Sequence, residues 1–312
     1  MAILNDYVKD ISVLPKNLIA FIDARKRQIE KVIKNCTELS VKEVRPGGSY
    51  KKKTMLNYKL DIDIVFIINK TKGKDWGNSM AELFTKLRTN CKNAHKIKQG
   101  NNIAVYVQFT FEKSIINFDI VLSFPLNSPN QTKDHVGEKT YQGGTTIWQI
   151  EYLNAYKGKQ YFTDIVILLK DWKAKNKIPF LKSFHIELLV AFVYGRYSNN
   201  FNGNIETILK ICFCKIHAML DGKPIIPINW KHSKKMNYKR HYTLPYMIDP
   251  GNLHDNLLSE LERDQSKIIR KNVSKSLTFL LQKDYEKIFK PEEKYFFKSN
   301  VMQKAKTSLN KR

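Results

Sequence analysis

The sequence contains few cysteines and no long apolar segment. Its four cysteines (Cys36, Cys91, Cys212 and Cys214) are too few and too scattered to form a disulfide framework. No apolar run approaches the roughly 20 residues that span a bilayer, and the N-terminus lacks the plan of a signal peptide. These absences argue against a disulfide-rich secreted protein and a membrane protein. We therefore expect a cytoplasmic protein with no membrane partner.

Acidic residues are in the minority. The 312-residue chain has 54 Lys and Arg against 29 Asp and Glu, a formal net charge of +25. Hydrophobic residues make up 42% of the sequence, which is enough for a substantial core and excludes a disordered polycation. A nucleic-acid or nucleotide partner would explain the surplus, because counterion release from phosphates drives binding. A lysine-rich composition throughout the chain is the alternative explanation.

The hydrophobic pattern predicts different elements in the two halves of the chain. A long amphipathic helix from Pro15 to about Asn35 is followed by strands at 61–68, 103–111 and 116–124, with a helical pattern at 80–87. Beyond a polar connection, helical patterns recur at 147–156, 162–176, 181–196, 204–220, 253–272 and 275–289. We predict an α+β fold, with a helix and a small mixed sheet in residues 1–146 and a helical bundle in residues 147–312.

Three aspartates stand on the predicted strands. Asp61 and Asp63 occupy positions i and i+2 of one strand, so their side chains point to the same face. Asp119 lies in the middle of another strand, where an uncompensated charge is costly. Three carboxylates on adjacent strands can hold two Mg²⁺ ions about 3.5–4 Å apart. The pattern predicts Asp61, Asp63 and Asp119 as metal ligands and catalytic residues.

A glycine turn, Gly47-Gly48-Ser49, precedes these carboxylates at a short distance along the chain. Backbone N–H groups at such a turn can approach phosphates closely, because glycine has no side chain. A surface Asp-x-Asp and an ordinary turn are the alternative interpretation of each feature alone. Their separation, together with a third aspartate in a later strand, favours a functional site.

The stretch GGSYKKKTMLNYKLDID resembles the signature of the polymerase-β-type nucleotidyltransferases. It is most similar to the branch that contains the 2′-5′-oligoadenylate synthetases, cyclic GMP–AMP synthase and the bacterial CD-NTases. FDIVLSF resembles the later strand that carries the third metal-binding aspartate. The resemblance implies a bilobal polymerase-β-like fold and an enzyme that uses ATP or other NTPs and two Mg²⁺ ions, or Mn²⁺, with release of pyrophosphate.

Three later segments extend the resemblance over most of the chain. FTDIVILLKDW resembles the helix whose lysine, here Lys170, reaches the triphosphate. LKSFHIELLV resembles the helix that places Ser183 on a phosphate and Phe184 on the base, and Gly48 and Ser49 complete the implied nucleotide site. MIDPGNLHDN resembles a late Asp-Pro motif near the cleft. Each segment alone also fits a structural role.

The sequence departs from the family pattern in two places. Phe184 stands where the family has a tyrosine. No His/Cys cluster matches the zinc insertion of cyclic GMP–AMP synthase, so no zinc is expected.

The family resemblance also implies an activating ligand that remodels the turn and the long N-terminal helix. Basic residues spread over a face suit a duplex backbone. We expect a double-stranded or structured RNA activator, with DNA less favoured, on Arg25, Arg27, Lys31, Lys34, Lys51, Lys52 and Lys53. A second basic and aromatic stretch runs from Trp230 to Arg240. The alternatives are a solvated helix face and a Lys52 that serves only the triphosphates.

Three hypotheses of function follow. The leading one is a monomeric, template-independent nucleotidyltransferase of innate immune or anti-phage signalling, which makes a cyclic di- or trinucleotide or a linear 2′-5′ oligoadenylate. The second is an RNA end-adding nucleotidyltransferase, whose positive charge binds the RNA substrate. The third is a catalytically silent RNA-binding module, which has no need for three aspartates beside its ligand. The sequence leaves linkage, base choice and ring size open.

Overall fold

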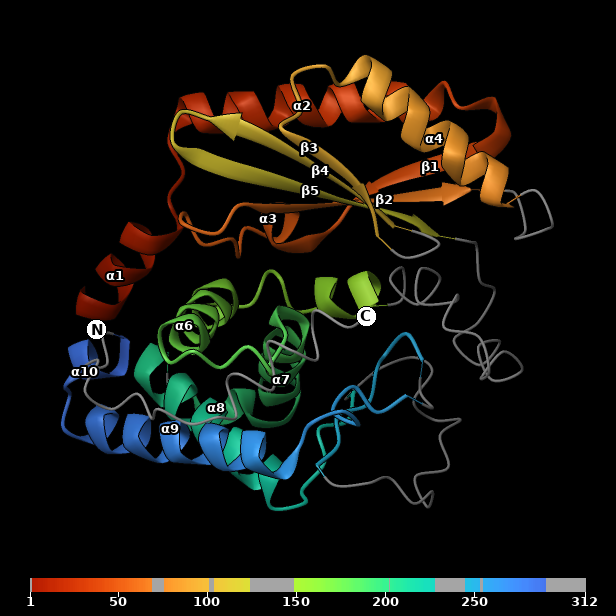
Figure 1. Ribbon diagram of the computed structural model, residues 1–312. Coiled ribbons are helices and arrows are strands. Elements are labelled where there is room, and N and C mark those ends of the chain that lie inside the picture. The colour runs from red at the N-terminus through yellow and green to blue at the C-terminus, as the bar shows by residue number, and fades with distance from the viewer. Residues whose placement is uncertain are drawn as a thin grey trace.

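The computed structural model describes residues 2–68, 76–100, 104–123, 149–201, 203–227, 245–252 and 255–289. The polar connection at 128–146, the basic stretch at 230–240 and the lysine-rich tail from Pro291 lie outside these residues. Figure 1 shows a sheet with its helices in one half of the molecule and a group of helices in the other. No helix in the described part of the chain is long and apolar enough to cross a membrane.

Five strands form one mixed sheet in the order β1-β2-β5-β4-β3. They are β1 (Val41–Pro46), β2 (Asp61–Ile68), β3 (Lys96–Gln99), β4 (Ala104–Phe111) and β5 (Ser114–Ser123). β2 and β5 run parallel, and all other neighbours run antiparallel. The three strands predicted from the sequence are confirmed, and β2 has the predicted bounds. The two edge strands, β1 with sequence VKEVRP and β3 with sequence KIKQ, were not predicted because they offer only two apolar residues and one to the pattern.

Helices α2 (Lys16–Lys34) and α4 (Trp76–Asn90) cover one face of this sheet (Figure 1). The apolar stripe predicted for the long N-terminal helix is buried there, and it packs against alternate strand residues such as Ile64 and Phe118. A short 3-10 helix, η1 (Thr37–Leu39), leads from α2 into β1. The opposite face of the sheet is turned toward α3 (Gly48–Lys52) and the helical half of the molecule (Figure 1).

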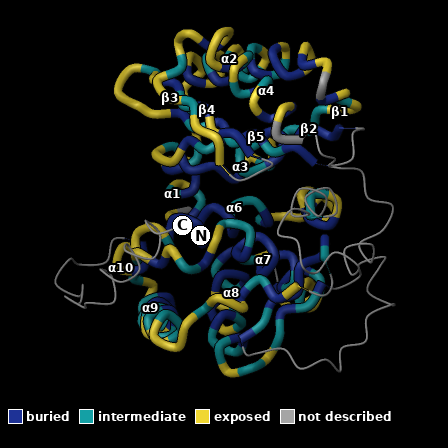
Figure 2. Tube along the Cα trace, turned by 45° about the vertical axis from the view of Figure 1, so that its right-hand side comes forward, coloured by how far each residue is buried: buried dark blue, intermediate teal, exposed yellow. Residues whose placement is uncertain are grey.

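The helical half is built around α6 (Phe162–Lys175), α7 (Ser183–Tyr197) and α8 (Ile205–Leu220), with a 3-10 turn, η4 (Ser198–Asn200), between the last two. Trp172 of α6 and Phe213 of α8 meet edge to face, with ring centroids 5.1 Å apart. α7 is largely apolar and is buried along most of its length (Figure 2). These three helices confirm the periodicity read from the sequence.

The last helices differ from the prediction. We predicted helices at 253–272 and 275–289, but α9 runs without a break over Arg263–Leu281 and is followed by the short α10 (Tyr285–Phe289). The buried residues of α9 are Ile269, Val273, Ser276 and Leu280, so one helical face continues through the predicted break. Upstream of α9, Asn256 accepts hydrogen bonds from the backbone N–H groups of Met247 and Leu258, which hold this segment in a non-helical bridge.

An N-terminal helix, α1 (Ala2–Ser12), was not predicted. Its residues Leu4, Val8 and Ile11 belong to the core of the helical half, although the sequence grouped residues 1–146 as one unit. The Tyr7 hydroxyl of α1 donates a hydrogen bond to the Asp171 carboxylate of α6, with an Oη–Oδ2 distance of 2.6 Å. The chain therefore starts in the helical half and then crosses to the sheet.

Candidate active site

The parallel pairing of β2 with β5 brings the predicted aspartates together. In this register Asp63 lies directly beside Asp119, and Asp61 lies beside Asn117. Paired residues of neighbouring strands point to the same face. The alternate residues Ile64 and Phe118 pack in the core with residues of α2 and α4, so the aspartates lie on the face turned away from these helices (Figure 1). The intervening Ile62 points into the sheet core. The three carboxylates are thus gathered on the face that looks toward the helical half.

Burial and mutual repulsion keep two of these carboxyl groups from ionising at their usual pH. Burial is the main cause that raises the pKa of Asp63 to about 6 and that of Asp119 to about 7, and neighbouring carboxylates act in the same direction. A bound cation would reverse both effects, and three hard oxygen donors suit Mg²⁺. The donor set therefore fits a divalent ion. In the residues described, no group of three or more His, Cys, Asp or Glu side chains is arranged to hold a metal ion, so metal binding stays a prediction.

Two amide side chains orient Asp61. The Asn117 amide donates a hydrogen bond to the Asp61 carboxylate, with an Nδ2–Oδ1 distance of 2.8 Å. The Gln108 amide donates in turn to the Asn117 oxygen at 2.9 Å, which fixes the orientation of the Asn117 amide. Sequence reasoning missed both residues. Asn117 and Asp119 stand at positions i and i+2 of β5, so their side chains share a face, and this spacing could have identified Asn117.

The glycine turn packs directly against Asp63. Gly48 has a φ of +62°, and a Cβ atom at this position would lie 1.6 Å from the Asp63 Oδ2 atom. The neighbouring Gly47 N–H donates to the Asp63 carbonyl oxygen at 2.9 Å. Only glycine combines this backbone conformation with this approach. The structure supports a special role for Gly48, and its predicted contact with phosphate stays a prediction.

A cavity of about 320 Å³ lies beside Asp61 and collects three of the predicted nucleotide contacts. Ser49, Lys170 and Ser183 all line it, although they come from three different elements. Three further lysines line the same cavity, and sequence reasoning missed them: Lys59, Lys173 and Lys177. Phe184 is half-buried and packs against the core of the helical half, and it is not among the residues that line this cavity.

Burial of the cavity wall has an electrostatic consequence for Lys173. Desolvation lowers the pKa of Lys173 to about 8, and the positive charges of Lys59 and Lys170 act in the same direction. An anion bound among these three ammonium groups would relieve their mutual repulsion. The cavity is therefore suited to a polyphosphate.

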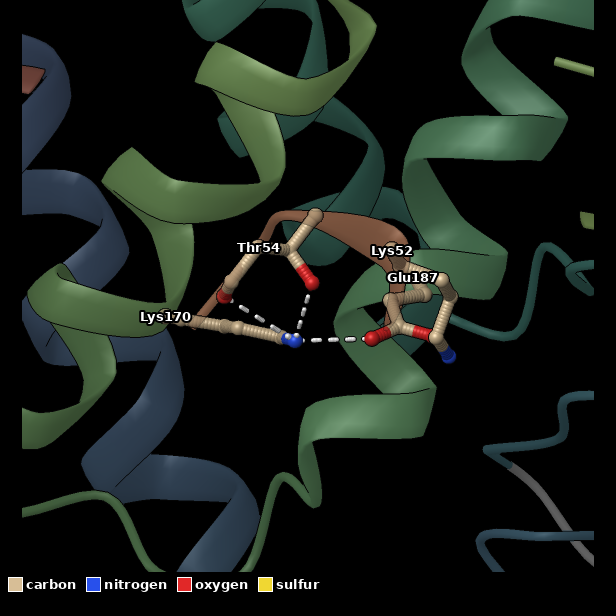
Figure 3. A network of polar contacts seen from close by, with 4 residues as sticks. All are labelled: Lys52, Thr54, Lys170 and Glu187. Atoms are coloured by element: carbon tan, nitrogen blue, oxygen red, sulfur yellow. Dashed lines mark hydrogen bonds and ion pairs between the residues drawn. The ribbon is translucent and has the colours of Figure 1, made fainter. Parts of the chain in front are cut away.

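Glu187 joins two of the predicted basic residues (Figure 3). It is buried on α7 and accepts a hydrogen bond from Lys170, with an Nζ–Oε1 distance of 2.7 Å, while its other oxygen pairs with Lys52 of α3. Lys170 also donates to the Thr54 hydroxyl at 3.0 Å. Burial opposes ionisation of Glu187, but the two lysines outweigh it and hold the pKa of Glu187 below its usual range. Sequence reasoning did not identify Glu187.

The residues predicted for an RNA surface are divided between two places. Arg27, Lys31 and Lys34 are exposed on α2, whereas Lys51 and Lys53 are exposed at α3, on the other side of the sheet (Figure 1). Arg25 does not join either group. Its guanidinium lies over the rings of Phe21 and Phe109, 4.9 and 5.2 Å from their centroids, and it donates to Gln28.

Comparisons with known proteins agree with this geometry. Residues 29–141 match the nucleotidyltransferase domain family. CdnC of E. coli MS115-1, solved with ATP, is similar over 92% of this chain and 96% of its own, with a TM-score of 0.67 and 20% identity. The Cid1 poly(U) polymerase with MgGTP is similar over 93% and 98%, with a TM-score of 0.66 and 13% identity. Terminal uridylyl transferase 4 from Trypanosoma brucei with GTP is similar over 90% and 97%, with a TM-score of 0.61 and 13% identity. A comparison with curated proteins returns no match.

Proposed function

The chain contains a nucleotidyltransferase domain and has the predicted polymerase-β-type nucleotidyltransferase fold, and on that premise we propose that it builds a nucleotide second messenger from ATP or other NTPs without a template. The observation that carries the proposal is the in-register pair of Asp63 and Asp119, with Asp61 beside them, next to a cavity lined by lysines. A donor triphosphate in that cavity places its α-phosphate near the carboxylates.

The proposed reaction is attack by a ribose hydroxyl oxygen on the α-phosphate. A new P–O bond forms, the bond to the β-phosphate breaks, and pyrophosphate leaves. Lys59, Lys170 and Lys173 hold the negative charge of the triphosphate and of the departing pyrophosphate. Asp119 accepts the proton of the attacking hydroxyl. Two Mg²⁺ ions bound by Asp61, Asp63 and Asp119 would supply further charge neutralisation at the reacting phosphate.

The kind of product is the finer part of the proposal. The similarity to CdnC and the sequence signature favour a cyclic di- or trinucleotide or a linear oligoadenylate, made in the cytoplasm by a monomer in innate immune or anti-phage signalling. RNA end addition is the second candidate, because a poly(U) polymerase and a terminal uridylyl transferase share the fold to a comparable degree. In both candidates the same carboxylates and lysines act on the donor.

One experiment separates the two candidates. The protein is incubated with all four NTPs, Mg²⁺ or Mn²⁺, and either no polynucleotide, single-stranded RNA or double-stranded RNA. Small products are identified by mass spectrometry, and added RNA is followed by labelling of its end. Small nucleotide products support the first candidate, and growth of labelled RNA supports the second. The Asp61→Asn/Asp63→Asn variant is the control, and product formation that survives in it would contradict the proposed site.

Activation by RNA is a further part of the proposal. It is supported by the exposed cations Arg27, Lys31 and Lys34 along α2 and by Lys51 and Lys53 beside the glycine turn. A duplex backbone can bridge cations along a helix without being read for sequence. Full synthesis without any polynucleotide would rule out this part and leave the catalytic proposal intact.

A further inference from the structure

Two rows of side chains cross the sheet from the catalytic aspartates to its far edge. The strand registers place Asp63, Asp119, Tyr106 and Lys98 directly opposite one another on four successive strands. They do the same for a neighbouring row, which consists of Asp61, Asn117, Gln108 and Lys96. Residues opposite each other in a sheet share a face, so all eight lie on the face that carries the carboxylates.

The rows change in chemistry from one end to the other. They begin with three carboxylates, continue through the amides of Asn117 and Gln108, and end in two exposed lysines on the edge strand β3. Tyr106 is 39% exposed although its strand, β4, is paired on both sides. The alternate residues of the same strands, such as Val107 and Phe118, are buried beneath α2 and α4. The exposed polar character is thus confined to one face.

Tyr106 is held in place by a glycine. A Cβ atom at Gly100 would lie 2.4 Å from the Cε2 atom of Tyr106, so the ring rests against the backbone at the end of β3. The Gly100 N–H closes this corner through a hydrogen bond to the Ala104 carbonyl at 2.9 Å. The result is an aromatic ring of fixed position between the catalytic carboxylates and the two edge lysines.

The rows and the cavity meet at Asp61 and otherwise have no residue in common. The cavity is lined by residues of α3, of the segment leading into β2, of Asp61 itself, and of α6, α7 and the segment between them, and by none from β3, β4 or β5. The rows lead from β2 across β5 and β4 to the edge strand β3. A molecule lying along them reaches the carboxylates across β4 and β5, which do not line the cavity.

We propose that this face binds the acceptor as a single-stranded oligonucleotide, with its terminal ribose hydroxyl at the aspartates, a base on Tyr106, and backbone phosphates at Lys96 and Lys98. Aromatic rings beside basic side chains are the usual means of binding single strands without sequence preference. The proposal rests on the proposed nucleotidyl transfer and specifies its acceptor.

The dimensions set a minimum length for that acceptor. Neighbouring strands lie about 4.8 Å apart, so two steps from Asp119 to Lys98 span about 10 Å. At a stacked rise of about 3.4 Å per nucleotide, this distance corresponds to about three nucleotides. An acceptor of one or two nucleotides therefore does not reach the edge lysines, and a longer one does. The acceptor is either a chain that the enzyme is itself extending or the end of a separate RNA.

The test compares acceptors of two and eight nucleotides in the wild type and in Lys96→Ala/Lys98→Ala and Tyr106→Ala. We expect both variants to raise the KM for the eight-nucleotide acceptor at least about fivefold. Lys96→Ala/Lys98→Ala should leave the KM for the NTP and the use of the two-nucleotide acceptor unchanged. Tyr106 lies one strand step from Asp119, within reach of a two-nucleotide acceptor, so Tyr106→Ala should leave only the KM for the NTP unchanged. Tyr106→Phe keeps the ring and should behave as the wild type. Lys9→Ala/Lys267→Ala removes the same charge from exposed positions of the helical half and is the matched control.

A direct binding measurement accompanies the kinetics. The affinity for a labelled eight-nucleotide single-stranded RNA is measured by fluorescence anisotropy at several salt concentrations. The slope of log affinity against log salt should fall by about 1.4 in Lys96→Ala/Lys98→Ala, because two phosphate contacts to a single strand are lost. Thermal unfolding of each variant shows that its fold is retained.

Two versions of the assay, one with NTPs alone and one with added RNA, identify the source of the acceptor. With NTPs alone, shorter products from the Tyr106→Ala variant mean that the growing chain occupies the face. With added RNA, reduced extension of that RNA means that a separate strand does. The proposal is overturned if the variants match the Lys9→Ala/Lys267→Ala control in KM and in RNA affinity, or if the wild type makes only cyclic dinucleotides. If the wild type transfers no nucleotide at all, the proposed function fails, and the anisotropy result still decides the binding face.

Discussion

The buried carboxylate of Glu187 on α7 accepts a hydrogen bond from Lys170 on α6, with an Nζ–Oε1 distance of 2.7 Å. Its second oxygen pairs with Lys52, which follows the glycine turn in the other half of the molecule. One carboxylate therefore ties the turn that packs on Asp63 to the helices that line the cavity beside Asp61.

Loss of Glu187 should be costly. Glu187→Ala leaves the buried Lys170 and the half-buried Lys52 without their carboxylate, and we expect the free energy of unfolding to fall by about 3–5 kcal/mol. Urea unfolding measures this change. Asp264→Ala breaks the exposed pair with Lys267 and should change stability by less than about 1 kcal/mol. Equal effects of the two substitutions would contradict the linking role of Glu187.

Gly48→Ala should inactivate the enzyme by displacing the Asp63 carboxylate, because the new Cβ would lie 1.6 Å from Oδ2. Gly203→Ala is a matched control, since Gly203 has a φ of +61° and open space around it. That variant should lose about 1 kcal/mol of stability through backbone strain alone and remain active. Nucleotide transfer and thermal unfolding are measured for both. An active Gly48→Ala enzyme would show that the turn can move without disturbing the site.

Asn117→Ala should weaken metal binding by about 10–100-fold, because Asp61 loses the amide that orients it. Gln108→Ala should have a smaller effect in the same direction, since it acts through Asn117. Binding of Mn²⁺ to the protein without nucleotide, followed by electron paramagnetic resonance, measures both. Asn90→Ala removes an amide whose hydrogen bond goes to a backbone carbonyl of its own helix, and it should leave Mn²⁺ binding unchanged.

Asp249 should make stability depend on pH. Burial raises its pKa to about 7, against the hydrogen bonds from Gly251 and Gln149. The folded protein then holds a proton that the unfolded chain releases near pH 4, so this group's contribution to stability is present at low pH and is lost as pH rises toward 7. Urea unfolding between pH 4 and 8 should show a flatter profile for Asp249→Asn than for the wild type. Parallel profiles for the two proteins would contradict the raised pKa of Asp249.

The exposed cations of α2 and the packed Arg25 should differ in their effect on activation by RNA. Arg27→Glu/Lys31→Glu changes exposed cations of α2 and should raise the RNA concentration needed for half-maximal activation without lowering the maximal rate. Arg25→Ala instead removes a guanidinium packed on Phe21 and Phe109, so it should lower the melting temperature and leave RNA activation unchanged. Identical activation curves for the first variant and the wild type would remove α2 from the RNA surface.

Local patterns in the sequence were sufficient to predict β2, β4 and β5 and the carboxylates they carry, but not the edge strands β1 and β3. The alternation of DIDIVFII predicts β2 together with the face that Asp61 and Asp63 share, and both are found. Asp119 was identified because a charge inside an apolar strand needs a reason. Both inferences depend only on residues close together in the chain, where side-chain periodicity is informative.

The residues that sequence reasoning missed owe their roles to distant partners. Glu187 looks like one polar position in an apolar helix, and Lys52, which pairs with it, lies 135 residues away. Asn117 reaches the Asp61 carboxylate only because of the register of β5 against β2. The predicted break before Lys275 was wrong because the packing of Ile269, Val273 and Leu280 overrides a local preference for ending the helix.

The parallel pairing of β2 with β5 also constrains the order in which the enzyme can mature during synthesis. Unlike a hairpin, a parallel pair cannot close until the crossover through α4, β3 and β4 has been made. Asp63 and Asp119 therefore become neighbours only after the whole sheet has emerged from the ribosome, and the carboxylate that secures Lys52 emerges later still. A nascent chain that stalls before α7 has its acidic residues in place but lacks the carboxylate that pairs with Lys52.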